Sequence, residues 1–238
     1  MQSSTLRLAA IFVGLAVIGV VVWIYFNPSA ESNPIVVDDE ERVVVLPFSE
    51  VNNFEDPPVG WTHEQFWMVN TMALANLQKD GKQALRCETK GDGSILTRTT
   101  DIDIWEYPTL VWDWFIEFPI SSPIDEATVE GDDHPVRLLL SVEDQSGGLH
   151  EFQIIWGNRD FEPGTYKQLG GLAHFVANGL DENTRVWQHQ EVDLMQVYRD
   201  ITGREDYPTL KSIGLHCDSN DTNSRSVAFI TDVALEVR

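Results

Sequence analysis

The sequence has few basic residues. It contains 16 Lys and Arg residues against 38 Asp and Glu residues, which gives a formal net charge of −22 at pH 7. Nucleic acids and anionic lipid headgroups are therefore poor partners, because phosphate repels a strongly negative surface. Two interpretations of the acidity stay open. It keeps the protein soluble, as in a saline habitat, or it forms a docking face for a basic protein.

Cysteine is also scarce, and familiar catalytic motifs are missing. The two cysteines, Cys87 and Cys217, lie far apart and outside any Cys-x-x-Cys pattern, which argues against a zinc site. The six histidines lack metal-ligand spacing, and there is neither a Gly-x-Ser-x-Gly elbow nor a phosphate-binding glycine loop. We therefore predict that the protein is not an enzyme and uses no cofactor. The cysteines are expected to form either a disulfide or two buried free thiols.

A long hydrophobic run is present near the N-terminus. Leu8 to Phe26 contains no charge, and as a helix it would be roughly 28 Å long, close to the hydrocarbon thickness of a bilayer. We predict that residues 1–26 are a cytoplasmic N-terminus and a single transmembrane helix, with Gly14 and Gly19 free to contact other helices. Arg7 precedes the run, which favours an N-terminus inside the cell. A cleaved signal peptide is the alternative, although its apolar core would be about 7 to 15 residues long.

The remaining chain is predicted to be an acidic linker, residues 27–42, followed by one domain, residues 43–238. Alternation of apolar and polar residues is strongest over Thr109 to Phe118. Leu194 to Thr202, closed by Gly203, is the one segment of the domain with a helical pattern. About ten short strands separated by turns predict an antiparallel jelly-roll-like β-sandwich with one short helix. The residues expected to share the inner face of the strongest strand are Leu110, Trp112, Trp114, Ile116 and Phe118.

Several short motifs occur in a recognisable order. They are Tyr107-Pro-x-Leu-x-Trp112-x-Trp114, Gly131-Asp-Asp133, Arg137, Trp156-Gly157, Asp206-Tyr207, Cys217-Asp-x-Asn-Asp-Thr222 and a last strand containing Asp232. This set resembles the domain-of-unknown-function family numbered 3047, mostly exported bacterial proteins, over about residues 48–238. The last strand also resembles the closing strand of carbohydrate-binding modules and galactose-binding-like sandwiches. The resemblance implies the fold more than an activity. Together with the hydrophobic run, it implies a bacterial inner-membrane protein with a periplasmic domain.

Two kinds of binding site are expected from residue types. Jelly-roll sandwiches often hold a structural calcium ion through hard oxygen ligands, and carbohydrates stack on exposed aromatic rings. The candidate calcium ligands in or beside loops are Asp132, Asp133, Asp218, Asp221 and Asp232. The tryptophans expected to be exposed, and so to bind a sugar, are Trp61, Trp105 and Trp187.

Three functions follow from these expectations. The predicted anchor and the missing catalytic motifs favour a non-catalytic accessory or scaffold subunit on the periplasmic face of a larger membrane complex, by analogy with bacterial photosynthetic or respiratory assemblies. Its partners would be integral membrane subunits and a basic periplasmic protein. The alternative is a membrane-tethered carbohydrate-binding domain. A glycan-active hydrolase is the third, and its paired carboxylates would come from Asp113, Glu117, Asp132 or Asp133.

Overall fold

The computed structural model describes residues 36–39 and 41–238. The predicted membrane anchor, including Gly14 and Gly19, lies outside the described residues, as does most of the predicted linker. Within the described part of the chain, no helix is both long enough and apolar enough to cross a membrane. The inner-membrane location and the integral membrane partners therefore stay predictions.

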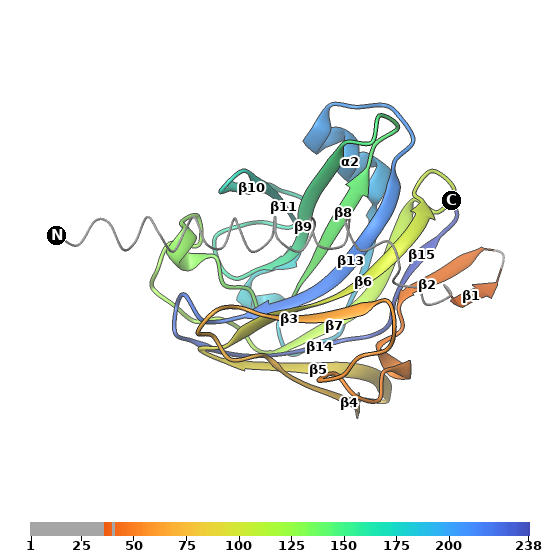
Figure 1. Ribbon diagram of the computed structural model, residues 1–238. Coiled ribbons are helices and arrows are strands. Elements are labelled where there is room, and N and C mark those ends of the chain that lie inside the picture. Colours follow the sequence, from red (N-terminus) through yellow and green to blue (C-terminus); the bar gives the residue numbers. More distant parts are fainter. Residues whose placement is uncertain (1–35, 40) are drawn as a thin grey trace.

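Two β-sheets face each other across a hydrophobic core (Figure 1). Sheet A contains β1 (Val36–Asp39), β2 (Arg42–Leu46), β4 (Ala73–Lys79), β5 (Lys82–Lys90), β7 (Thr109–Phe118), β12 (Gln188–Asp193), β14 (Arg225–Ile230) and β15 (Val233–Glu236). Sheet B contains β3 (Trp61–Gln65), β6 (Gly93–Asp103), β8 (Arg137–Glu143), β9 (Leu149–Gly157), β10 (Tyr166–Leu169), β11 (Leu172–Gly179) and β13 (Thr209–Asp218). The strand order is β1-β2-β15-β7-β14-β5-β4 in sheet A, with β12 also paired to β7, and β10-β11-β9-β8-β13-β6-β3 in sheet B. The predicted mainly β sandwich is confirmed.

Two details differ from the prediction. Residues Val36–Asp39, inside the predicted linker, form β1 and pair antiparallel with β2. In sheet B, β11 runs parallel to β9, although every other described pair is antiparallel. The tight hairpin at Gly170 and Gly171, both with positive φ, reverses the chain between β10 and β11, and the second strand of this hairpin is the one that lies against β9.

The predicted last strand is interrupted at Thr231 and Asp232. The N–H of Asp113 donates to Thr231 Oγ1 at 2.9 Å, and the Asp232 carboxylate accepts from the N–H and the hydroxyl of Ser49 at 2.9 and 2.5 Å. The Thr231 hydroxyl thus takes the place of a main-chain acceptor for the Asp113 N–H at the break. The segment therefore forms two strands, β14 and β15, which both pair with β7.

Strand β7 supplies much of the core. The alternation is confirmed for Leu110, Trp112, Trp114 and Ile116, which are 0–3% exposed. Phe118, at the end of the strand, is instead 41% exposed. The ring of Trp114 meets the ring of Trp156 from sheet B edge to face, with centroids 5.6 Å apart. Large aromatic rings thus join the two sheets at the centre of the sandwich.

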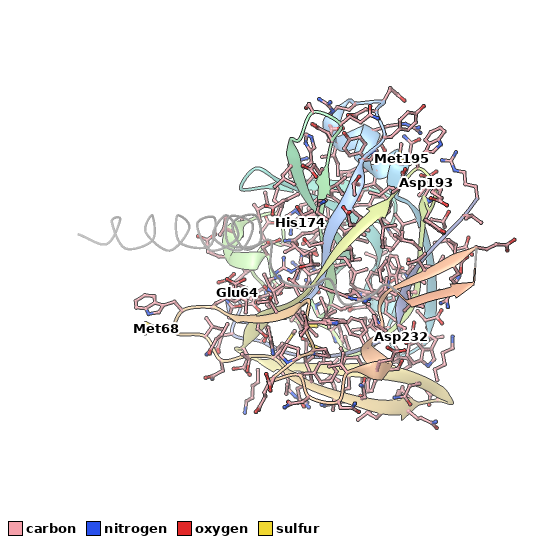
Figure 2. The ribbon with its side chains drawn as sticks, turned by 45° about the vertical axis from the view of Figure 1, so that its right-hand side comes forward. Glu64, Met68, His174, Asp193, Met195 and Asp232 are labelled. Atoms are coloured by element: carbon pink, nitrogen blue, oxygen red, sulfur yellow. The ribbon has the colours of Figure 1, made fainter. Side chains whose placement is uncertain are left out.

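The single α-helix described in the domain is α2 (Leu194–Thr202), as predicted. It begins where the Asp193 carboxylate accepts the N–H of Gln196, and it ends at Gly203, which has a φ of 68°. Both are common helix end signals. Figure 2 shows Asp193 and Met195 at the same end of the molecule, remote from Met68.

Candidate functional site

Several loops meet at one end of the sandwich. Figure 1 shows residues 119–135, in light green, and residues 219–224, in blue, at the same end. The Asp133 carboxylate accepts the N–H and the hydroxyl of Thr222 at 2.7 and 2.5 Å. The main-chain oxygen of Asp133 accepts the side-chain amide of Asn158 at 2.7 Å. Three loops that are distant in sequence are thereby fixed to one another.

A buried glutamate holds the same loops together. Glu126 is 3% exposed, and its carboxylate accepts the main-chain N–H groups of Asn158, Arg159 and Asp160 at 2.7, 3.0 and 3.1 Å. Main-chain donors offset the cost of burying the charge. The Glu126 oxygens are therefore committed to loop structure.

Below these loops lies a group of buried charges. Arg137, at the start of β8, donates to Asp132 at 3.2 Å, to Gln153 at 3.1 Å and to Asp218. Lys167, whose side chain is 2% exposed, also donates to Asp132. Such charges are tolerated in the interior only when they are paired. We call the following residues the ionic cluster: Asp132, His134, Arg137, Lys167, His174 and Asp218.

The surroundings of Asp132 keep it ionised. Burial alone would raise the pKa of the Asp132 carboxyl, but the charge of Arg137 and the nearby His134 and His174 imidazoles hold that pKa well below its usual range. The carboxylate is thus a permanent negative centre among the cations of the ionic cluster.

His134 is fully buried and neutral. Its Nδ1 lies 2.7 Å from the main-chain oxygen of Trp156, so this nitrogen carries the proton, and its Nε2 lies 3.3 Å from Lys167 Nζ, from which it accepts. Burial lowers the pKa of His134 to about 4, outweighing the hydrogen bond with Asp132 that would raise it. The folded protein therefore keeps the His134 imidazole unprotonated at neutral pH.

This buried imidazole predicts acid sensitivity. The folded pKa of His134 lies below its unfolded value, so the unfolded chain binds a proton first and stability falls as pH drops from about 6.5 to about 4. We expect His134 to contribute roughly 3 kcal/mol to this loss. Urea unfolding at several pH values, compared with His134→Asn, measures the contribution. Asn can still donate to Trp156 but cannot titrate, so equal pH slopes in the two proteins would contradict the prediction.

A cavity of about 500 Å³ lies at the same end of the molecule. This volume is within the usual range for small-molecule sites. One wall is apolar, formed by Phe118, Pro119, Ile120 and Ile124. The polar lining includes Ser122, Glu126, Asn158, Arg159, Asp181, Thr184 and Arg185. The cavity and the ionic cluster are joined, because Glu126 lies 3.8 Å from His134 and Asn158 holds the loop that follows Asp132.

Some polar groups of the cavity already have hydrogen-bond partners within the protein and others do not. Arg159 donates to Asp160 and to the main-chain oxygen of Ser122. Asn158 is 8% exposed, and because its Nδ2 donates to a carbonyl, its orientation is fixed. Its Oδ1 is buried without a partner among the described residues. Ser122 Oγ accepts the N–H of Ile124 and still has its own proton to donate. The free groups are thus both donors and acceptors.

A comparison with protein-family models identifies the chain. The model described as "Protein of unknown function (DUF3047)" matches residues 59–234. The chain belongs to the DUF3047 family. A search of curated proteins gave no match.

Among solved structures, this DUF3047 chain is similar to β-sandwiches of low sequence identity. One is the family 11 carbohydrate-binding module of a cellulosomal cellulase from Clostridium thermocellum, with 8% identity, a TM-score of 0.43, and coverage of 79% of this chain and 94% of that one. Another is a carbohydrate-binding module, CBM28, specific for non-crystalline cellulose, with 16% identity, a TM-score of 0.40, and coverage of 75% and 89%. A third is the xyloglucanase domain of NopAA from Sinorhizobium fredii, with 8% identity, a TM-score of 0.41, and coverage of 75% and 94%.

Four of the five predicted calcium ligands of this DUF3047 chain do gather at the loop end. Asp132 and Asp218 bind Arg137, Asp133 accepts donors from Thr222, and the N–H of Asp221 lies 3.3 Å from Asp133. The arrangement does not fit a calcium ion, because cationic, N–H and hydroxyl donors occupy the carboxylate oxygens of Asp132, Asp133 and Asp218. Residues 41–238 contain no group of three or more His, Cys, Asp or Glu residues placed to hold a metal. Asp232 lies apart, bound to Ser49 and at the opposite end from Met68 (Figure 2).

The three tryptophans nominated for sugar binding lie in different places, and none lines the cavity. Trp61 is 7% exposed and packs against Phe48, so its predicted exposure is wrong. An edge strand still buries one face against the core, and Trp61 lies on that face. Trp105 is 53% exposed and meets Tyr207 edge to face. Trp187 is half-buried beneath Lys82 on the outer face of sheet A.

The most exposed tryptophan of the described DUF3047 domain, Trp67, was not among the predicted sugar-binding residues. Trp67 and Met68 are both 84% exposed in the β3–β4 loop, and Met68 has a φ of 63°. A left-handed backbone with a bulky side chain is strained and turns both side chains outward. Such conformations have no clear sequence signature outside Gly, Asn and Asp.

The cysteines and the carboxylates nominated for hydrolysis have structural partners. Cys87 and Cys217 are buried free thiols in this DUF3047 structure. Asp113 binds Lys82 and His189, and Glu117 binds Lys79. Asp113 and Glu117 are four residues apart on β7, which separates them by roughly 13 Å, beyond the carboxylate spacing of glycosidases, at most about 9.5 Å.

Proposed function

We propose that the cavity binds a carbohydrate and that the protein does not act on it chemically. The observation that supports this best is the set of uncommitted polar atoms described above. A buried amide oxygen, that of Asn158, needs a donor, while Ser122 offers one. Each sugar hydroxyl both donates and accepts, so one ligand class satisfies both groups.

The apolar wall of the cavity suits the C–H faces of a sugar ring. Pyranose rings present C–H groups on their faces and pack against aromatic and aliphatic side chains. Phe118 is 41% exposed at the cavity, and Arg225 lies over its ring at 4.7 Å. The ring is therefore held in place by a neighbour before a ligand arrives, which reduces the entropic cost of binding.

The expectation of binding without catalysis is supported by the hydrogen bonds that the Glu126 carboxylate of the cavity already makes. Hydrolysis needs two carboxyl groups facing the scissile bond, one of them free to transfer a proton. Glu126 gives its oxygens to three main-chain N–H groups, which leaves Asp181 as the other carboxylate of the lining. We therefore expect no release of reducing ends from any glycan that binds.

Isothermal titration of a panel of soluble oligosaccharides tests the proposal. Asn158→Leu is expected to weaken binding by about tenfold or more, since a buried acceptor that meets a ligand hydroxyl is removed. Asn76→Leu is a matched control, because Asn76 also donates its amide to main-chain oxygens, has a buried unpartnered Oδ1, and lies outside the cavity. Equal losses in the two variants, or no binding to the wild type at millimolar oligosaccharide, would reject the proposal.

A further inference from the structure

One cation at the cavity is unusual in this acidic chain. Among the arginines of residues 41–238, Arg185 is the one whose guanidinium makes no hydrogen bond or ion pair, although it lines the cavity. The other cavity arginine, Arg159, is held by Asp160. With 38 acidic residues against 16 basic ones, an arginine without a carboxylate partner is unexpected.

The backbone holds Arg185 in an unfavourable conformation. Leu180 and Arg185 bound a short segment that forms one wall of the cavity, and both have positive φ, 70° and 60°. Leu180 has a ψ of 152°, a region that is normally confined to glycine. The N–H of Arg185 donates to the main-chain oxygen of Ile116 at 2.8 Å, which fixes this end of the segment. Strain of this kind persists where the surrounding structure imposes a position, commonly at ligand sites.

A guanidinium with this freedom has a preferred ligand chemistry. Its planar fork of N–H donors matches a carboxylate, which it binds with two parallel hydrogen bonds. Asp181 also lines the cavity, but it lies beyond ion-pair distance of Arg185. The Arg185 fork is therefore available to a carboxylate that enters with a ligand.

We infer that the cavity selects an acidic sugar, a uronic acid residue whose carboxylate binds Arg185 while a ring hydroxyl donates to Asn158 Oδ1. This inference rests on the proposed carbohydrate site and specifies its ligand class. It requires no chemical step, because recognition consists of one charge-assisted pair and hydrogen bonds to hydroxyl groups. The negative net charge of the chain repels anions at long range, so the selection acts at contact through Arg185.

Three matched ligands test the inference by isothermal titration of the full chain. They are a galacturonate oligomer, the same oligomer with its carboxylates methyl-esterified, and a neutral glucose oligomer of equal length. The galacturonate oligomer is expected to bind at least tenfold more tightly than its methyl ester. Arg185→Gln is expected to reduce that ratio to about one while leaving the melting temperature unchanged, since the side chain is exposed and makes no hydrogen bond or ion pair with a described residue.

The control is Lys90→Gln, which removes another cation that makes no ion pair among the described residues and does not line the cavity. It is expected to keep the selectivity of the wild type. Equal affinity for the acid and its ester overturns the inference but leaves the carbohydrate site standing. No binding of any oligomer rejects the carbohydrate site itself. A lower melting temperature in Arg185→Gln also overturns the inference, because it assigns Arg185 a structural role.

Discussion

Replacing Arg137 with methionine is expected to lower the free energy of unfolding by about 3–5 kcal/mol at neutral pH. Arg137 is 3% exposed and donates to both Asp132 and Asp218. Lys167 still binds Asp132 in the variant, but Asp218 loses its cation inside the protein. The substitution leaves an unpaired carboxylate in the interior. The free-energy cost of that buried charge is much larger than the cost of losing one contact.

The pH dependence identifies this cause. Burial already raises the pKa of the Asp218 carboxyl, against the charge of Arg137, which lowers it. Without Arg137 the folded pKa rises further above the unfolded value, so the group gains a proton on folding and the deficit shrinks as pH falls from 7 towards 5. Urea unfolding of the variant and the wild type at both pH values measures this deficit. Arg225→Met, which breaks an exposed pair with Glu88, should cost less than about 1 kcal/mol. The double variant Arg137→Met with Asp218→Asn should regain most of the loss. A cost like that of the Arg225 variant would contradict the prediction.

Sequence patterns predicted the elements whose signals are local. The alternation along β7 marked its inner face, and Asp193 and Gly203 mark the ends of α2. Both depend on neighbours within a few residues, so tertiary contacts did not override them. The parallel pairing of β11 with β9 depends on which strand of a hairpin lies against a third strand, and no local pattern encodes that choice.

The candidate site was predictable in part. Acidic loop residues indicated where Asp132, Asp133, Asp218 and Asp221 would gather, but the type of site depended on Arg137 and on lysine and histidine residues from other strands. The cavity was not foreseen. Ser122, Asn158 and Arg185 come from three separate loops and carry no motif, so only their meeting in space gives them a role. Trp61 is the opposite case: it was predicted as an exposed binding residue, but its side chain packs in the core.

Folding in a glutathione redox buffer is expected to join Cys87 to Cys217 and to raise the free energy of unfolding by about 4–5 kcal/mol. Cys87 lies on β5 of sheet A and Cys217 on β13 of sheet B, and both face the same core at 1% and 0% exposure. Burial, followed by a side-chain hydrogen bond with Cys87, raises the pKa of the Cys217 thiol. The two sulfurs are therefore near neighbours, and the bond would close a loop of about 130 residues in the unfolded chain.

The reaction removes two hydrogen atoms from the thiols and reduces one glutathione disulfide to two glutathione molecules. Because attack requires an accessible thiolate, burial protects both cysteines once the sandwich has formed, and the raised pKa of Cys217 adds to its protection. Disulfide formation therefore depends on whether the oxidant is present before or only after the protein has folded. Oxidant present during refolding should leave no thiol that reacts after denaturation, whereas oxidant added to the reduced, folded protein should leave two. Cys217→Ala should gain no stability from either treatment. Two reactive thiols after oxidative refolding would show that the sulfurs do not come within bonding distance as the two sheets close.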